Sequence, residues 1–192
     1  MATTIQDGTG TKVKAGVDNN NRLLVDSVQR SEREETSIMG EAYIMGTGFV
    51  TLTAQTPSSV LYFKNNGDED LVITRFIVSV RKSTGGTEDH VRGIIYKNPT
   101  SMSNGTGVDL VINNINFGSS NTIESDSEIG KEGASLNGGT TFLATVAPTE
   151  QITSEDAATI IPRGSSIGVS IIPPAGNTSI QVGVGINIHK LI

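Results

Sequence analysis

One serine lies in a pattern that carries nucleophilic catalysis in some hydrolases. Gly164-Ser165-Ser166-Ile167-Gly168 matches GxSxG, in which a strained strand-to-helix turn exposes the serine hydroxyl. The residues after Ser166 alternate in a way that predicts a strand instead of a helix, and no His–acid pair is placed to complete a triad. We therefore interpret the pattern as a turn that leads into a strand. An esterase-like enzyme is the alternative, and it would require Ser166 in the geometry of a nucleophile.

The two histidines give little support for acid–base chemistry. Asp89 and His90 are adjacent, and a carboxylate with an imidazole suits proton transfer. Neighbouring residues of a strand point to opposite faces, however, so the two groups would be separated. We expect His90 at the tip of a loop and His189 in solvent.

Two further patterns could bind ions. Glu124, Asp126 and Glu128 alternate as ligands of calcium could, because that cation takes several oxygens from a flexible loop. The segment lacks the Asx-Gly pattern of a dedicated calcium loop. The sequence GTGTK at residues 8–12 is not a P-loop, because no strand precedes it and no GKS/T follows. The sequence therefore predicts no catalytic residue, no metal and no cofactor.

Composition and charge exclude several classes of protein. The 192 residues include no cysteine, so disulfides, thiolate metal sites and cysteine nucleophiles are excluded. The net charge of −6 repels a phosphate backbone, and no basic patch interrupts it, so we expect no nucleic acid partner. No apolar run approaches the roughly 20 residues of a membrane helix, and residues 1–10 lack the features of a signal peptide. These features predict a soluble protein that is made in a cytoplasm and has no membrane partner.

Hydrophobic periodicity predicts an all-β body. In SIQVGVGINIH, residues 179–189, apolar residues alternate with polar residues or glycines, which is the period of a strand with one face inward and one outward. Similar runs, closed by Gly, Pro, Asn or Asp, predict eight strands. They lie near residues 42–53, 58–64, 70–81, 91–97, 108–117, 139–147, 165–172 and 179–189. An antiparallel β-sandwich in the form of a jelly roll of about eight strands fits best, and an immunoglobulin-like sandwich is the alternative.

Some of these strands are apolar on both faces. In LVITRFIVSV, Val72, Phe76, Val78 and Val80 form one row, whereas Leu71, Ile73 and Ile77 form the other. The segments VLYF (60–63) and GIIY (93–96) have the same double character. A strand of a two-layer sandwich needs only one apolar face, so the second row requires a cover. A long loop, the N-terminal segment or another subunit could supply it.

Two segments between the predicted strands are expected to form a helical turn and a loop. Residues 153–158, TSEDAA, could form one helical turn with Thr153 or Ser154 as its cap. Residues 118–138 show no strong periodicity and form the longest connection, which is typical of a loop with a function or a neighbour to contact.

The first 40 residues differ from the rest and predict an N-terminal attachment arm, residues 1–40, before a sandwich domain, residues 41–192. These residues, which include DNNNRLLVDSVQRSEREE at 18–35, have too few large apolar groups to offset the entropy of ordering, so in isolation they should be disordered. Residues 27–35 could form a short helix with a weak Arg30–Glu34 pair. The residues expected to bind a partner are Val13, Val17, Arg22, Leu23, Leu24 and Val25.

The chain resembles virion structural proteins of tailed bacteriophages. The resemblance lies in the arm GTGTKVKAGVDNNNRLLVDSVQRSE, followed by LYFKNNGDEDLVITRFIVSV, STGG, KNPT, NFGSS and IIPRGSSIGVSIIPPAGNTSIQVGVGI. It covers nearly the whole chain and involves turn and strand signatures without chemistry. It implies a jelly-roll body, an attachment arm and a non-enzymatic role.

The resemblance also implies partners and a location. It implies a capsid decoration, or cement, protein that stabilises a phage capsid by binding the lattice of the major capsid protein or another virion protein. Such a protein would be a homotrimer on the virion surface, assembled in the cytoplasm of the host bacterium. The alternative is a tail, fibre or baseplate component, which includes a receptor- or carbohydrate-binding module. With three tyrosines and no tryptophan, sugar stacking has few candidate residues.

Overall fold

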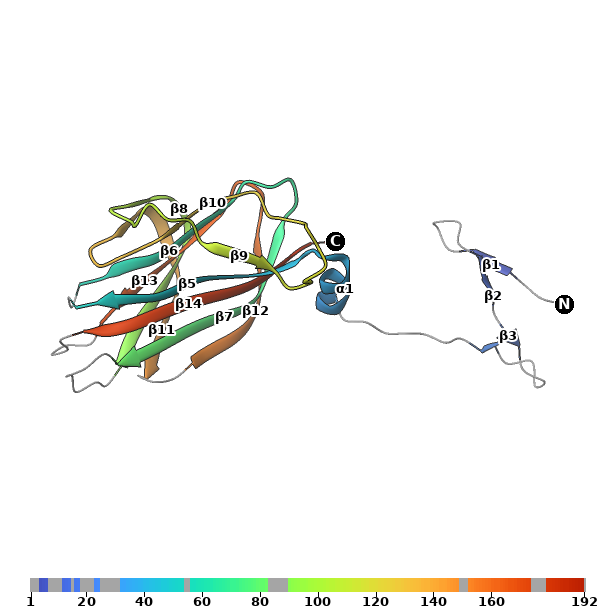
Figure 1. Cartoon of the computed structure of the whole chain (residues 1–192), viewed down its shortest axis with the longest axis horizontal. Helices are drawn as coiled ribbons and strands as arrows, with labels where there is room; N and C mark the ends of the chain where they lie inside the picture. The colour runs from blue at the N-terminus through green and yellow to red at the C-terminus, as the bar shows by residue number, and fades with distance from the viewer. Residues whose placement is uncertain are drawn as a thin grey trace. The chain divides into compact units, whose positions relative to one another are not determined.

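The chain divides into two compact units in a computed structural model (Figure 1). The first unit is Met1–Ser31 and the second, the body, is Glu32–Ile192. The structure describes residues 4–6, 12–14, 16–17, 23–24, 32–53, 56–82, 90–148, 152–173 and 179–191.

Two short strand pairs are described in the N-terminal unit. β1 (Thr4–Gln6) pairs with β2 (Lys12–Lys14), and β3 (Gly16–Val17) pairs with β4 (Leu23–Leu24), both antiparallel. Two-stranded ribbons of this length are marginal in water without a packed face. The described strand pairs are therefore too short to be stable by themselves.

The body contains one helix and ten strands within the described residues. The helix is α1 (Glu32–Met39). The strands are β5 (Ala42–Leu52), β6 (Ser58–Asn65), β7 (Leu71–Lys82), β8 (His90–Ser103), β9 (Val111–Asn114), β10 (Ser125–Ile129), β11 (Ser135–Pro148), β12 (Ile152–Ile161), β13 (Ser166–Ile172) and β14 (Ile180–Lys190). Among the described segments, no helix is long and apolar enough to cross a membrane.

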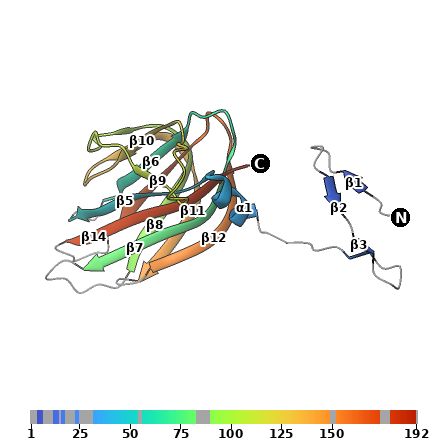
Figure 2. The ribbon, with the colours of Figure 1, turned by 45° about the vertical axis from the view of Figure 1, so that its right-hand side comes forward.

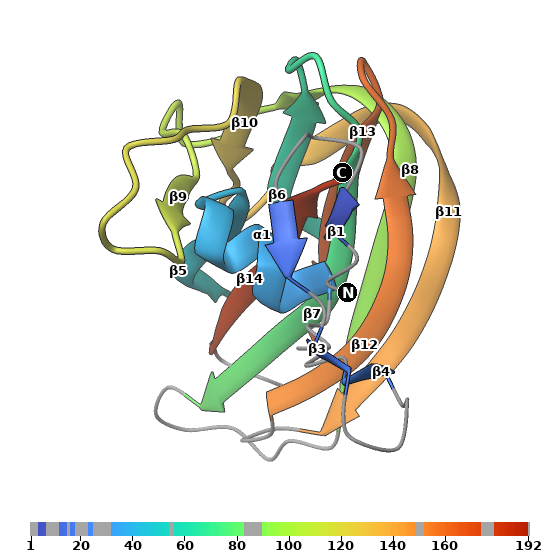
Figure 3. The same cartoon turned by 90° about the vertical axis from the view of Figure 1, so that its right-hand side faces the viewer.

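The ten strands form two five-stranded antiparallel sheets. One sheet has the order β10-β6-β13-β8-β11 and the other the order β12-β7-β14-β5-β9. Figure 2 shows β5, β14, β7 and β12 side by side, and Figure 3 shows the two sheets from the end of the body at which α1 lies. β8 pairs with β11, the strands on either side of them in sequence, β7 and β12, pair with each other, and so do the next two, β6 and β13. This order of pairing is that of the doubled-back ribbon of a jelly roll. The predicted antiparallel β-sandwich is confirmed, with ten strands in place of about eight.

Hydrophobic periodicity did not predict two of the strands, β10 and β12. β12 contains the segment predicted as a helical turn, which is wrong, because β12 pairs with β7 from Ile152 to Ile161. β10 and the first part of β11 lie within residues 118–138, which were predicted as a loop. Both β10 and β12 are edge strands, where polar and charged residues are tolerated because one side of the strand faces outward.

The core depends on β14, the middle strand of its sheet. Ile180, Val182, Val184, Ile186 and Ile188 are all buried, as their alternation predicts. They belong to one cluster with apolar residues of both sheets. The opposite row was predicted to face water or a partner, and this holds only in part. Gln181, Gly183 and Gly185 are half-buried, whereas Asn187 and His189 are buried.

A bulge changes the predicted rows of β7. Ile186 pairs with Phe76 and Ile188 pairs with Ile73, so Thr74 is an extra residue on β7. Directly paired residues point to the same face. Leu71 and Ile73 therefore join Phe76 on the inner face, whereas Val72, which pairs with His189, lies on the opposite face. The predicted rows of these three residues are wrong.

The second apolar row of β6 is covered by the chain itself. β8 bends at Asn98, whose φ is 55°, and its far end reaches the outer face, where the Tyr62 hydroxyl donates to the carbonyl of Thr100 over 3.0 Å. Leu136 lies directly over Gly168, because a Cβ at residue 168 would overlap its side chain. Gly168 pairs with Tyr62 on one side. The double character of VLYF thus requires no second subunit.

A polar loop fixes the end of α1 to the body. Thr36 is fully buried, and the helix ends at Gly40, whose φ of 74° suits a glycine. The Asn114 side-chain amide donates to the carbonyl of Gly40 over 2.7 Å, and that of Asn116 donates to the carbonyl of Ile38 over 3.0 Å. Carbonyls at the end of α1 that lack partners inside the helix are therefore satisfied by side chains at the end of β9 and just after it.

The two faces of β14 can be tested by one substitution on each. Val184→Asp should prevent folding, because an unpaired buried carboxylate costs several kcal/mol against a total stability of about 5–15 kcal/mol. Gln181→Asp is the matched control and should remain folded, because Gln181 is half-buried on the outer face. Circular dichroism and urea unfolding measure both. Equal damage from the two variants would contradict the facing assignment.

Candidate partner-binding site

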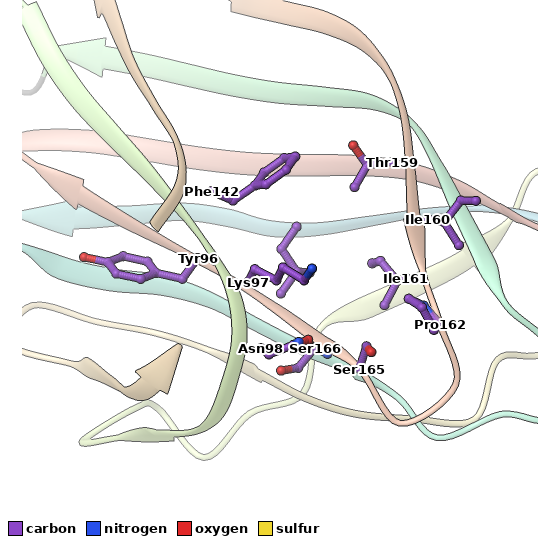
Figure 4. A pocket seen from close by; sticks show the side chains of 11 residues that line it. Tyr96, Lys97, Asn98, Phe142, Thr159, Ile160, Ile161, Pro162, Ser165 and Ser166 are labelled. Atoms are coloured by element: carbon purple, nitrogen blue, oxygen red, sulfur yellow. Dashed lines mark hydrogen bonds between the residues drawn. The ribbon is translucent and has the colours of Figure 1, made fainter. Parts of the chain in front are cut away.

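An apolar pocket of about 520 Å³ opens at one side of the body. In Figure 4, Tyr96 and Phe142 lie on one side of it, and Thr159, Ile160 and Pro162 lie on the other. The lining residues are Tyr96, Lys97, Asn98, Phe142, Thr159, Ile160, Ile161, Pro162, Ser165, Ser166 and Ile167. They come from β8, β11, β12, β13 and the turn between β12 and β13.

The pocket exists because both sheets end there. β11 is the last strand of one sheet and β12 is the last strand of the other, and Figure 3 shows them at the same side of the sandwich. The pairing of each strand shifts beside the pocket, between Thr141 and Leu143 in β11 and between Asp156 and Thr159 in β12. Such bulges redirect side chains and end regular pairing. Phe142 is 52% exposed and Ile160 is 51% exposed.

Several polar groups of the lining form hydrogen bonds within the chain. The Ser166 hydroxyl donates to the carbonyl of Pro99, and the Ser166 amide donates to Asn98 Oδ1 over 3.3 Å. The Ser165 amide donates to the carbonyl of Pro162 over 3.0 Å. The accessible lining is mainly apolar, and the exposed Lys97 is its one charged residue. The arrangement suits an apolar side chain of a partner better than a charged substrate.

The GxSxG pattern has a structural explanation in this fold. Gly164 has a φ of 75° in the turn before β13, and Gly168 leaves room for Leu136. Ser166 is buried and is the first residue of a strand, as predicted. A nucleophile elbow instead exposes its serine before a helix. Each glycine of the pattern is thus explained by backbone geometry or packing.

The other predicted chemical groups are not assembled into one site. His189 is buried, with its Nδ1 lying 3.2 Å from the carbonyl oxygen of Lys190, so its predicted exposure to solvent is wrong. The backbone of His90 begins β8, which corrects its predicted place at a loop tip; its side chain and Asp89 lie outside the described residues. Within the described part of the chain, no group of three or more His, Cys, Asp or Glu could hold a metal ion.

Two of the three alternating acidic residues lie along a strand. Asp126 and Glu128 belong to β10, where they pair with Lys64 and Tyr62. Glu128 Oε1 accepts a hydrogen bond from the Gly107 amide over 3.0 Å. Burial, with the nearby charge of Asp126, raises the pKa of Tyr62. The residues therefore follow an extended strand and do not converge as a calcium loop does.

A partly buried ion-pair network lies where α1 meets the body. Lys190 Nζ is 2.8 Å from Glu41 Oε2 and 3.7 Å from Glu69 Oε2. The hydrogen bond with Glu41 raises the pKa of Lys190. The hydroxyl of Tyr43 donates to Glu41 over 3.3 Å, and burial raises the pKa of Tyr43. The network stabilises the start of β5 against the end of β14.

The arm residues predicted to bind a partner belong to the N-terminal unit. The backbone of Val13 lies in β2, that of Val17 in β3, and those of Leu23 and Leu24 in β4. Arg22 and Val25 lie outside the described residues. The prediction that these side chains bind a partner therefore stays a prediction.

Sequence reasoning missed the pocket residues. Phe142 follows GGTT and precedes LATV, so simple alternation cannot assign its face once β11 contains a bulge. Ile160 lies in the strand that was predicted as a helical turn. The sequence signal that could have indicated these residues is a pair of apolar segments, 142–147 and 159–162, on either side of a polar stretch.

Comparisons with known proteins found little. No family model and no curated protein matches the chain. Among solved structures, it is similar to a chain of the T=1 particles derived from infectious bursal virus, at 14% sequence identity and a TM-score of 0.20. The similarity covers 78% of this chain but 40% of that chain. With so low a TM-score, no inference about fold or function is drawn from it.

The structural account of Ser166 predicts a small effect of its removal. Ser166→Ala should lower the free energy of unfolding by about 1 kcal/mol, the usual contribution of one hydrogen bond. Hydrolysis of 4-nitrophenyl acetate should be the same for both proteins. Ester turnover by the wild-type protein that disappears with the hydroxyl would contradict this interpretation.

The Lys190 network predicts a pH-dependent stability difference. Since the folded-state pKa of Lys190 is raised, the stabilisation is fully present below the usual lysine pKa of about 10.4 and is lost as pH rises through the folded-state value. Urea unfolding should therefore show that Lys190→Met destabilises the protein at pH 8 and matters less at higher pH. Lys131→Met, at an exposed position, is the control. A Lys190→Met effect that stays constant with pH would contradict the account.

Proposed function

We propose that this protein is a non-enzymatic structural component of a virus particle, which decorates a phage capsid by binding the lattice of the major capsid protein. The observation that carries the proposal is the division of the chain into a small N-terminal unit and a sandwich body. This is the organisation that the resemblance to virion proteins of tailed phages implies. The arm binds the particle, and the body forms a homotrimer on its surface.

The chemistry of the body supports a binding role. The accessible surface of the pocket is mainly apolar, and the lining serine hydroxyl is bonded to a backbone carbonyl. Several large apolar side chains are exposed on the body, among them Phe49, Phe117 and Phe142. Of these, Phe142 lines the pocket, and an exposed apolar surface around a pocket is typical of contact surfaces between proteins.

A receptor- or carbohydrate-binding tail component is the second candidate. Tyr96 and Phe142 in the pocket wall favour it, because aromatic faces stack on sugars. Tyr43 and Tyr62 are buried, so of the three tyrosines in the chain only Tyr96 is available for such stacking. Binding to immobilised glycans that is lost in Tyr96→Ala would favour this candidate over decoration.

The arm can be tested by a deletion that keeps α1. Removing residues 1–31 should leave a folded body, because every residue of the core cluster lies between Tyr43 and Ile188. The deletion should abolish co-sedimentation with particles that lack this protein. Each large side chain contributes about 1.5–3 kcal/mol when fully buried, and three arms acting together gain about 10² to 10⁴ in affinity.

A substitution within the arm sharpens this test. Changing Leu23 and Leu24 together to serine should weaken co-sedimentation as the deletion does. Changing Asn19 and Asn20 to serine is the matched control and should leave binding unchanged. If the protein without residues 1–31 binds particles as well as the full chain, the arm is not the anchor.

A further inference from the structure

Phe117 is completely exposed at the connection between β9 and β10. Its relative exposure is 103%, and Ile38 and Met39 of α1 are 54% and 53% exposed. The Asn116 amide group bonds the carbonyl of Ile38, so the loop and the end of α1 are neighbours. An aromatic side chain can bury about 150–250 Å² in a contact, none of which Phe117 buries in its own chain.

The loop that carries Phe117 is fixed by hydrogen bonds. Asn116 Oδ1 accepts from the Gly118 amide over 3.0 Å, and Asn114 Oδ1 accepts from the Asn116 amide over 2.8 Å. The Ser119 amide donates to the carbonyl of Asn116 over 3.0 Å. These bonds hold the residues on both sides of Phe117. The side chain is thus presented by an ordered loop, which lowers the entropy cost of inserting it into a partner.

Phe117 and the apolar pocket lie on opposite sides of the same body. Phe117 follows β9, the edge strand of one sheet, and the pocket lies beside β12, the edge strand at the other end of that sheet. Figure 3 shows β9 and β10 at one side and β11 and β12 at the other. One side therefore presents an exposed aromatic ring and the other an open apolar hollow.

The Phe117 loop and the pocket also lie at the same height along the direction of the strands. Ile161 of the pocket pairs with Leu71, and Leu71 pairs with Lys190. The Lys190 amide donates to the carbonyl of Glu41, and the Ile115 amide donates to that of Ala42. This row crosses the sheet from the pocket to the start of the Phe117 loop. A rotation about an axis along the strands can bring one feature to the other without a shift along that axis.

We propose that Phe117 of one copy inserts into the pocket of the next copy, between Phe142 and Ile160, so that copies join head to tail. This interface rests on the homotrimer of the proposed function and names the surfaces that form it. Head-to-tail contacts form closed rings when the rotation between copies closes, and the shared level favours a ring over a filament. Among the described residues, Lys97 lies at the pocket, whereas Asp109 and Glu124 are exposed on the β9–β10 side, so these charges of the two surfaces are opposite in sign.

Substitutions on each surface test the contact. Phe117→Asp and Ile160→Arg should each convert an oligomer into monomers by light scattering, with association weakened about tenfold or more, as expected for a central contact residue. Phe49→Asp is the control, because Phe49 is 56% exposed on β5, away from both surfaces, and it should leave the oligomer intact. Circular dichroism confirms that each variant is folded. A full-length oligomer that survives both substitutions, or a monomeric wild-type protein at micromolar concentration, overturns the interface.

Mixing the variants tests the head-to-tail arrangement. Phe117→Asp keeps an intact pocket and Ile160→Arg keeps an intact Phe117, so an equimolar mixture should form dimers that do not grow further. Because the chain has no cysteine, a Gly118→Cys, Thr159→Cys double variant, which keeps Phe117 and Ile160, should also form disulfide-linked chains up to the size of the ring on oxidation. A Phe49→Cys, Thr159→Cys variant should not. Absence of dimers in the mixture and of cross-links in the double variant overturns the proposal.

The outcomes separate this interface from the function on which it rests. Particle binding is measured by co-sedimentation and depends on the arm, whereas the interface is measured without particles. Loss of arm-dependent binding with an intact Phe117 contact contradicts the decoration role alone. An oligomer that is insensitive to Phe117→Asp contradicts the interface alone.

Discussion

The body depends on the apolar row of β14, because this strand pairs with β5 on one side and with β7 on the other. Its buried residues contact the apolar residues of the facing sheet, so one strand connects both layers of the core. The nested pairs β6–β13, β7–β12 and β8–β11 place the remaining strands around it. The pocket between β11 and β12 and the loop after β9 lie at the two ends of this arrangement.

The parts of the fold that follow a regular period could be predicted from the sequence. The alternation of residues 180–188 predicts both the strand and its inner face, because a period of two leaves one arrangement that buries the apolar side chains. Extra residues break that rule. Thr74 in β7 moves Ile73 to the opposite face, and no local signal distinguishes it from a regular strand residue. β12 is formed by pairing with β7, which overrides the weak strand propensity of Glu155 to Ala158.

The candidate site could be predicted less well, because it is formed by segments that are distant in sequence. Tyr96, Phe142 and Ile160 come from three strands and meet only after both sheets have formed. Ser166 was correctly interpreted as the start of a strand, but the reason for Gly168 is the side chain of Leu136, which no local pattern indicates. A glycine that leaves room for a distant side chain has the same appearance in a sequence as a glycine of a catalytic motif.

The joint between α1 and β5 determines how the body would respond to mechanical load. A pull applied through the N-terminal unit reaches α1 first and then β5, whose 11 residues pair with β14 over nearly their whole length. A force along a strand loads the ladder of hydrogen bonds together, whereas a force across it would open them one at a time. The bonds from Asn114 and Asn116 to the end of α1 share that load with the loop after β9. A pull along β5 would therefore be resisted by this whole ladder in shear.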